Sequence, residues 1–303
     1  MTIQPVHPLQ PEQRSPRLAR LAAQAKGVLK TYRTPLLIIA ALVFIGGFAL
    51  SVSRLELTLA DISIGYILLS GVIIVPLAFA YGAFNFMIMA RGAGLRVPFT
   101  RAFQITCVAQ FAEFLPIPGG ALVRGGALMQ RGTGAVDSAA HVTVNALLWV
   151  ACAALVGGLS LGLGNPVALA IFLGGSLGIA GCTAWLTRKA GVGIALAALA
   201  MRFVGLVFAG ARLFAAFAAI GVTLAVLDLY PFVFATILGS AAAIAPGGLG
   251  ISEVAAAALA TLSTIPPEAA FLAVALNRLI GFAASGVAAG ILAVFSSNGT
   301  SQT

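Results

Sequence analysis

The stretch APGGLGISE, residues 245–253, lies in one of the most apolar parts of the chain, yet it combines helix breakers with a carboxylate. Proline and adjacent glycines interrupt a helix, and a charged group is costly in hydrocarbon. A similar phrase, EFLPIPGGALVRGG, occupies residues 113–126. The chain therefore interrupts its backbone twice and places charged residues at both interruptions.

The composition of the chain indicates an integral membrane protein. Of its 303 residues, 60% are hydrophobic and only 8% are charged, whereas soluble domains carry about 25% charged residues. Several apolar runs reach the roughly 20 residues that a spanning helix needs, and the alternation of a membrane barrel is absent. The sequence therefore predicts an all-α membrane protein.

The formal net charge of +9 owes much to a basic segment that precedes the first apolar run. By the positive-inside rule, residues 1–34 are expected to form a cytoplasmic tail. Nucleic acid is excluded as a partner, because the positive charge does not lie on one face of a soluble domain. A short amphipathic helix over 16–33 is expected to lie on anionic lipid. The three cysteines lie apart in apolar surroundings, so no disulfide, metal or cofactor is expected.

Residues 35–295 are expected to form one transmembrane domain with two interrupted segments, 99–131 and 230–264. Each half of an interrupted segment is too short to cross a membrane. We therefore expect two re-entrant helical hairpins, the first entering from the cytoplasm and the second from outside. Six spans complete the domain, over 35–53, 64–89, 137–161, 167–187, 203–227 and 268–294.

The remaining segments are expected at the membrane surfaces. Residues 190–202 are predicted to be interfacial, with Arg202 at the cytoplasmic end of the fifth span. Arg212 lies about two turns inside that span and is expected to reach the same surface by extending its side chain. Residues 296–303 are predicted to form a polar cytoplasmic tail.

The predicted elements repeat in the two halves of the domain, about 35–162 and 167–295. Each half reads span, span, hairpin, span, and the second half begins on the opposite side of the membrane. This order fits an inverted repeat, a transporter architecture in which broken helices meet near the bilayer midplane.

The breaks expose backbone N–H groups at the start of two half-helices, where an anion binds favourably. The glycines allow a ligand or another backbone to approach closely. The alternative is that each motif is only a tight turn between two spans. The candidate binding glycines are Gly119 and Gly120 in the first segment, and Gly247, Gly248 and Gly250 in the second.

Charged residues near the breaks are the other candidates for a binding site. Arg278 lies about ten residues inside the last span, beside Asn277, and is expected to pair with Glu253 or to face a watery cavity. In the first segment, Glu113 and Arg124 flank the break, and we expect them either to pair with each other or to leave Arg124 to bind a phosphate. The alternatives are a structural ion pair, a carboxylate that complements the helix dipole, and placement near interfacial water.

The histidine and asparagine of the third span are a further candidate pair. His141 and Asn145 share one helix face, and that face is expected to point inward. A satisfied core pair is favoured over a proton relay.

The motifs FLPIPGGALVRGGAL, residues 114–128, and APGGLGISE resemble the lysylphosphatidylglycerol synthase transmembrane-region family. The resemblance covers most of 35–295. It implies a lipid flippase or translocase of the bacterial cytoplasmic (inner) membrane. Full synthases carry a soluble aminoacyl-transferase domain after the membrane part. This chain ends at Thr303, so we expect no such activity.

Three functions remain open from the sequence. The first is a translocase that moves a phospholipid or lipid-linked intermediate with an anionic or zwitterionic headgroup. The second is a membrane-embedded transferase acting on a lipid-linked substrate. The third is an envelope-assembly protein without transport. A second copy of the chain and an envelope-pathway enzyme are the candidate protein partners.

Overall fold

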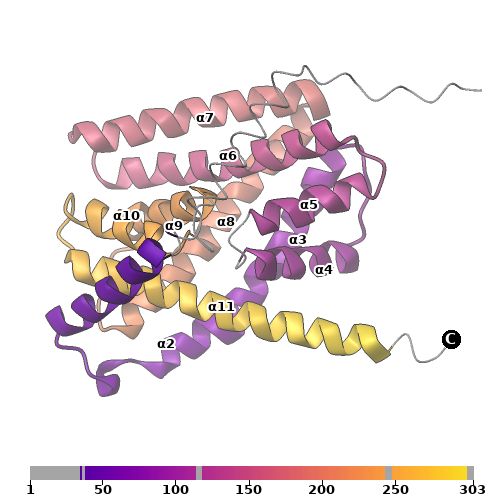
Figure 1. Cartoon of the computed structure of the whole chain (residues 1–303). Coiled ribbons are helices and arrows are strands. Elements are labelled where there is room, and N and C mark those ends of the chain that lie inside the picture. Colours follow the sequence, from indigo (N-terminus) through magenta and orange to yellow (C-terminus); the bar gives the residue numbers. More distant parts are fainter. Residues whose placement is uncertain (1–34, 36–37, 114–117, 243–247, 299–303) are drawn as a thin grey trace, which may run out of the picture.

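The computed structural model describes residues 35, 38–113, 118–242 and 248–298, which form helices and no strand (Figure 1). Gly247 and the two tails, 1–34 and 299–303, lie outside these residues, as does most of the predicted segment 296–303. The helices are Ile38–Arg54, α2 (Ile64–Leu68), α3 (Val75–Gly92), α4 (Phe99–Ala112), α5 (Gly119–Met129), α6 (Ala135–Ser160), α7 (Pro166–Ala190), α8 (Val192–Ala219), α9 (Tyr230–Ala242), α10 (Ile251–Ala260) and α11 (Pro267–Asn298). A π-helical segment, η2 (Leu69–Ile74), joins α2 to α3.

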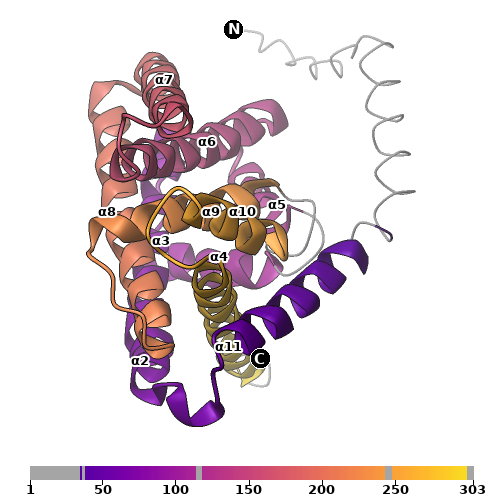
Figure 2. The same ribbon diagram turned by 90° about the vertical axis from the view of Figure 1, so that its left-hand side faces the viewer.

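Five helices are long and apolar enough to cross a membrane, which indicates a multi-pass membrane protein. They are the continuous helix Ile64–Gly92, α6, α7, α8 and the first 25 residues of α11. The expected span over 35–53 corresponds to the shorter apolar helix Ile38–Arg54. In Figure 2 this helix lies at the periphery of the bundle, and its Phe44 ring contacts Phe271 of α11.

The expected boundary near residue 202 is wrong. Residues 192–219 form one unbroken helix, α8, instead of an interfacial segment followed by a span. At 1.5 Å per residue, Arg202 lies about 15 Å and Arg212 about 30 Å from the start of α8. Arg202 is buried, and Arg212 is too far from that end to extend to its surface. Arg202 therefore belongs to the interior of the bundle, and Arg212 is half-buried.

The exposed charges separate toward two ends of the molecule. At one end, Gly92 of α3 approaches Ala190 and Ile194, and Asp137 of α6 pairs with Lys189 of α7. At the other end, the Ser63 amide donates to the Ala219 carbonyl, 2.9 Å away. The basic end carries Arg91, Arg96, Arg101, Arg131, Arg188 and Lys189 with Asp137, and the acidic end carries Arg54, Glu56, Asp61, Asp228 and Glu268.

Two pairs of short helices approach the centre of the bundle from these opposite ends. Helix α4 starts and helix α5 ends at the basic end, at the right of Figure 1. Helix α9 starts and helix α10 ends at the acidic end, at the left. The Pro-Gly-Gly motifs fall between the helices of each pair. The charged residues next to those motifs are thereby placed in the interior.

The main apolar core joins α6, α7, α8, α9, α10 and α11. Small residues bring these helices close together, as at Gly158 and Gly175, where the facing backbones of α6 and α7 leave no space for a Cβ. Close approach at small residues is typical of helix packing in membranes. The core therefore holds α9 and α10 firmly against the long helices.

Candidate functional site

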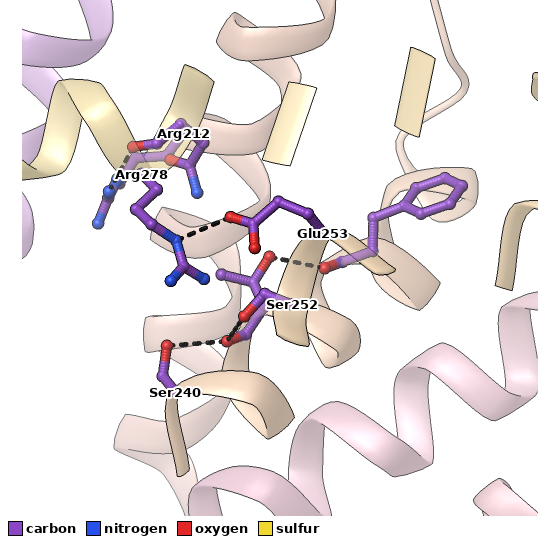
Figure 3. A network of polar contacts seen from close by, with 8 residues as sticks. Arg212, Ser240, Ser252, Glu253 and Arg278 are labelled. Carbon is purple, nitrogen blue, oxygen red and sulfur yellow. Dashed lines mark hydrogen bonds and ion pairs between the residues drawn. The ribbon is translucent and has the colours of Figure 1, made fainter. Parts of the chain in front are cut away.

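Glu253 and Arg278 form a closed ion pair in the interior (Figure 3). Arg278 Nε lies 2.9 Å from Glu253 Oε1, and the exposed fractions of the two side chains are 4% and 0%. Glu253 is the third residue of α10, where a carboxylate complements the helix dipole. The pairing expected from the sequence is confirmed. Among the described residues, however, no acceptor lies in hydrogen-bonding geometry with Nη1 or Nη2 of Arg278.

Arg212 reaches the same region from α8 and lies beside Arg278 in Figure 3. Its Nη2 donates to the backbone carbonyl of Asn277, 3.2 Å away. A Cβ on Gly281 would lie 2.6 Å from this nitrogen, so the glycine makes room for the guanidinium. The Asn277 side-chain oxygen is buried without a hydrogen-bond partner among the described residues. The expectation that Arg212 extends to the membrane surface is thus replaced by a contact with α11.

Glu113 and Arg124 make the corresponding pair in the other set of short helices. Arg124 Nη1 lies 3.3 Å from Glu113 Oε1, and both side chains are partly exposed. Glu113 caps the C-terminus of α4, and Arg124 lies in the middle of α5. Glu113 also lies near enough to Arg212 of α8 to interact with its charge.

Arg202 is a site residue that the sequence patterns did not reveal. Its Nη2 donates to Asn145 Oδ1 at 2.8 Å, and its guanidinium carbon lies 5.7 Å from the centre of the Trp149 ring. It lies near Tyr81, Cys152 and the like-charged Arg124. Among the described residues, no carboxylate forms an ion pair with it. One signal in the sequence was available, since residues 192–219 contain no proline that would end a helix before Arg202.

The expected inward orientation of His141 and Asn145 is confirmed, since both are buried. Asn145 Nδ2 donates to the His141 backbone carbonyl at 3.0 Å, and the His141 ring lies edge-on to Trp185. Asn145 therefore orients Arg202 through its side-chain oxygen, while its side-chain nitrogen is hydrogen-bonded to the backbone of α6.

The glycines of the first motif lie against α4. A Cβ on Gly119 would collide with the Ala112 carbonyl, and one on Gly120 would lie 2.6 Å from Glu113 Oε1. The start of α5 is therefore next to the Glu113 carboxylate, as the start of α10 is next to Glu253. In both places a glutamate already occupies the position that the sequence suggested for a bound anion.

Two glycines of the second motif adopt positive φ angles, +77° at Gly248 and +80° at Gly250. At Gly248 a Cβ would collide with the Gly239 carbonyl of α9, and at Gly250 it would lie 2.9 Å from the Ala40 carbonyl. The glycines therefore turn the chain sharply and let α9 and the helix Ile38–Arg54 pack against this turn.

The interior cluster carries more positive than negative charge. It comprises two glutamates, both in ion pairs, and four arginines: Glu113, Glu253, Arg124, Arg202, Arg212 and Arg278. Within the described part of the chain, no group of three or more His, Cys, Asp or Glu side chains is placed to hold a metal ion. The chemistry that these residues offer is anion binding by guanidinium groups.

No family model, curated protein or solved structure matches this chain.

Proposed function

We propose that this protein moves a phospholipid or a lipid-linked intermediate between the leaflets of a bacterial cytoplasmic membrane. The observation that carries the proposal is the excess of arginine over glutamate in the interior of the helix bundle. A buried charge costs several kcal/mol unless it is paired, and two of the four guanidiniums have neutral partners. A phosphate supplies the missing negative charge.

Phosphate is also the group whose geometry suits these side chains. Guanidinium groups bind phosphate through paired N–H donors, and among the described residues no acceptor is in hydrogen-bonding geometry with Nη1 or Nη2 of Arg278. Arg212 lies beside it. Under the proposal, Arg212 and Arg278 hold the headgroup phosphate on one side of the cluster, and Arg124 and Arg202 hold it on the other.

The proposed path uses the two pairs of short helices as re-entrant hairpins. Their approach from opposite ends supports an inverted repeat with broken helices near the midplane. The basic end is proposed to face the cytoplasm, by the positive-inside rule. This arrangement agrees with the proposed kinship to the lysylphosphatidylglycerol synthase transmembrane region.

The proposal is tested by reconstituting the full chain in liposomes that contain fluorescent anionic or zwitterionic phospholipid and measuring exchange between leaflets. We expect faster exchange than in empty liposomes. We expect R212Q to lower that rate by about tenfold or more, because a charge-assisted hydrogen bond is lost. The matched control R188Q removes an exposed arginine of α7 and should leave the rate unchanged. A wild-type rate equal to that of empty liposomes for every lipid class would refute the proposal.

A milder variant separates transport from stability. G281A places a methyl group next to Arg212 Nη2, a flexible side-chain end, so we expect the protein to fold. The rate should fall several-fold, since the guanidinium is displaced. The control G286A, on the same helix and with open space around the new methyl group, should behave as wild type.

A second candidate function is an envelope-assembly protein without transport. It is favoured by one observation, the closure of the Glu253–Arg278 pair, whose side chains are almost fully buried. Under this alternative the arginines only hold the helices together. Translocation by the wild-type protein that is lost in G281A without loss of stability would exclude it.

A further inference from the structure

A groove between α4 and α5 is lined by none of the residues of the interior cluster. Its volume is about 370 Å³, which falls within the usual range for small-molecule sites. One wall follows α4 from Arg101 through Gln104 to Val108, and the other follows α5 from Leu122 through Gly126 to Arg131 just beyond its end. The lining residues form one stripe on each side, because they recur at intervals of three and four.

The groove changes in character along its length. Arg101, Gln104 and Arg131 lie at the basic end of the molecule, and Arg101 Nη1 donates to Gln104 Oε1 at 3.2 Å. Toward the centre of the bundle the walls become aliphatic, and Val108 and Leu122 are 49% and 59% exposed. From Arg101 to Val108 the helix rises about 10 Å. The groove therefore runs from a cationic mouth to an apolar floor.

The charge of the groove is not compensated by acidic residues. None of the residues that line it is acidic. Asp137, the acidic residue at the same end, pairs with Lys189 on α7. A ligand that matches both parts of the groove has an anionic headgroup and an aliphatic chain.

We propose that the α4–α5 groove binds one anionic phospholipid, with its phosphate between Arg101 and Arg131 and the start of an acyl chain against Val108 and Leu122. Charge complementarity at the mouth and exposed aliphatic side chains beyond it carry this assignment. None of the four arginines of the interior cluster lines this groove. It requires no transport, so it stands or falls independently of the proposed function.

The test is native mass spectrometry of the full chain in detergent, with phosphatidylglycerol or phosphatidylcholine added. Wild-type protein should retain a phosphatidylglycerol molecule in preference to phosphatidylcholine. R101Q/R131Q should bind phosphatidylglycerol roughly thirtyfold more weakly, since two basic residues near an anionic lipid are removed. The matched control R91Q/R96Q removes two arginines that lie at the same end but line a different hollow, beside the loop between α3 and α4, and should bind as wild type.

A second variant fills the groove without changing its charge. A Cβ added at Gly126 would meet no other atom within 4 Å, so G126L should fold while its side chain occupies the groove and lowers phosphatidylglycerol binding. G181L is the control, since Gly181 of α7 is equally unobstructed. Equal loss in R91Q/R96Q, unchanged binding in G126L, or equal retention of the two lipids would each overturn the proposal.

Discussion

The closed pair of Glu253 and Arg278 gives the sharpest prediction about stability. Its side chains are 0% and 4% exposed, and the joined atoms are 2.9 Å apart. Replacing either residue by a neutral one leaves the other charge buried without an ionic partner. Loss of one member of a buried pair costs about 3–5 kcal/mol. We therefore expect E253Q and R278M each to destabilise the protein by that amount.

The double variant E253Q/R278M removes both charges together. Replacing a whole buried pair by neutral side chains of similar size is often close to neutral, so most of the lost stability should return. The control is D137N, which breaks the exposed pair with Lys189 and should cost no more than about 1 kcal/mol.

Three buried cysteines provide the assay. Cys107, Cys152 and Cys182 are free and buried, so a thiol-reactive dye reports unfolding in detergent as they become exposed. The unfolding midpoints of the two single variants, the double variant and D137N are compared. The reasoning about a buried pair is refuted if the unfolding midpoints of E253Q and R278M are no lower than that of D137N. It is also refuted if the double variant loses as much stability as the two single variants together.

Two other variants test the packing that positions the site, by the same thiol assay. G248A should destabilise the protein by more than about 2 kcal/mol, because its methyl group collides with the Gly239 carbonyl and the positive φ adds strain. The control G221A has nearly the same φ but open space around the new methyl group. Equal losses of stability in the two variants would contradict this reasoning. N145L should cost about 1.5–3 kcal/mol, because Arg202 loses its charge-assisted hydrogen bond, and an unchanged midpoint would contradict the assigned contact.

Residue type and spacing predicted the positions of the helix breaks and the two ion pairs. Proline and glycine cannot continue a helix without cost, so the ends of α4 and α9 follow from local chemistry. An arginine deep in an apolar run requires a partner, which identified Glu253 for Arg278. These inferences need little knowledge of the tertiary structure.

The role of α8 was not predicted, because the charge of Arg202 was interpreted as the end of a span. Basic residues often mark membrane surfaces, and Arg188 and Lys189 nearby do lie at the basic end. What distinguishes Arg202 is its contact with Asn145 and Trp149 on α6. Such contacts depend on how α6 and α8 pack, which hydrophobic periodicity does not specify.

The central proposal is that the interior arginines, which outnumber the glutamates, bind a lipid phosphate. The most direct measurement is a cryo-electron microscopy structure of the full chain, bound to an antibody fragment, in a lipid nanodisc that contains phosphatidylglycerol. We predict headgroup density within hydrogen-bonding distance of Arg212 or Arg278. Guanidinium groups that contact only protein, with every headgroup confined to the membrane surface, would contradict the proposed role.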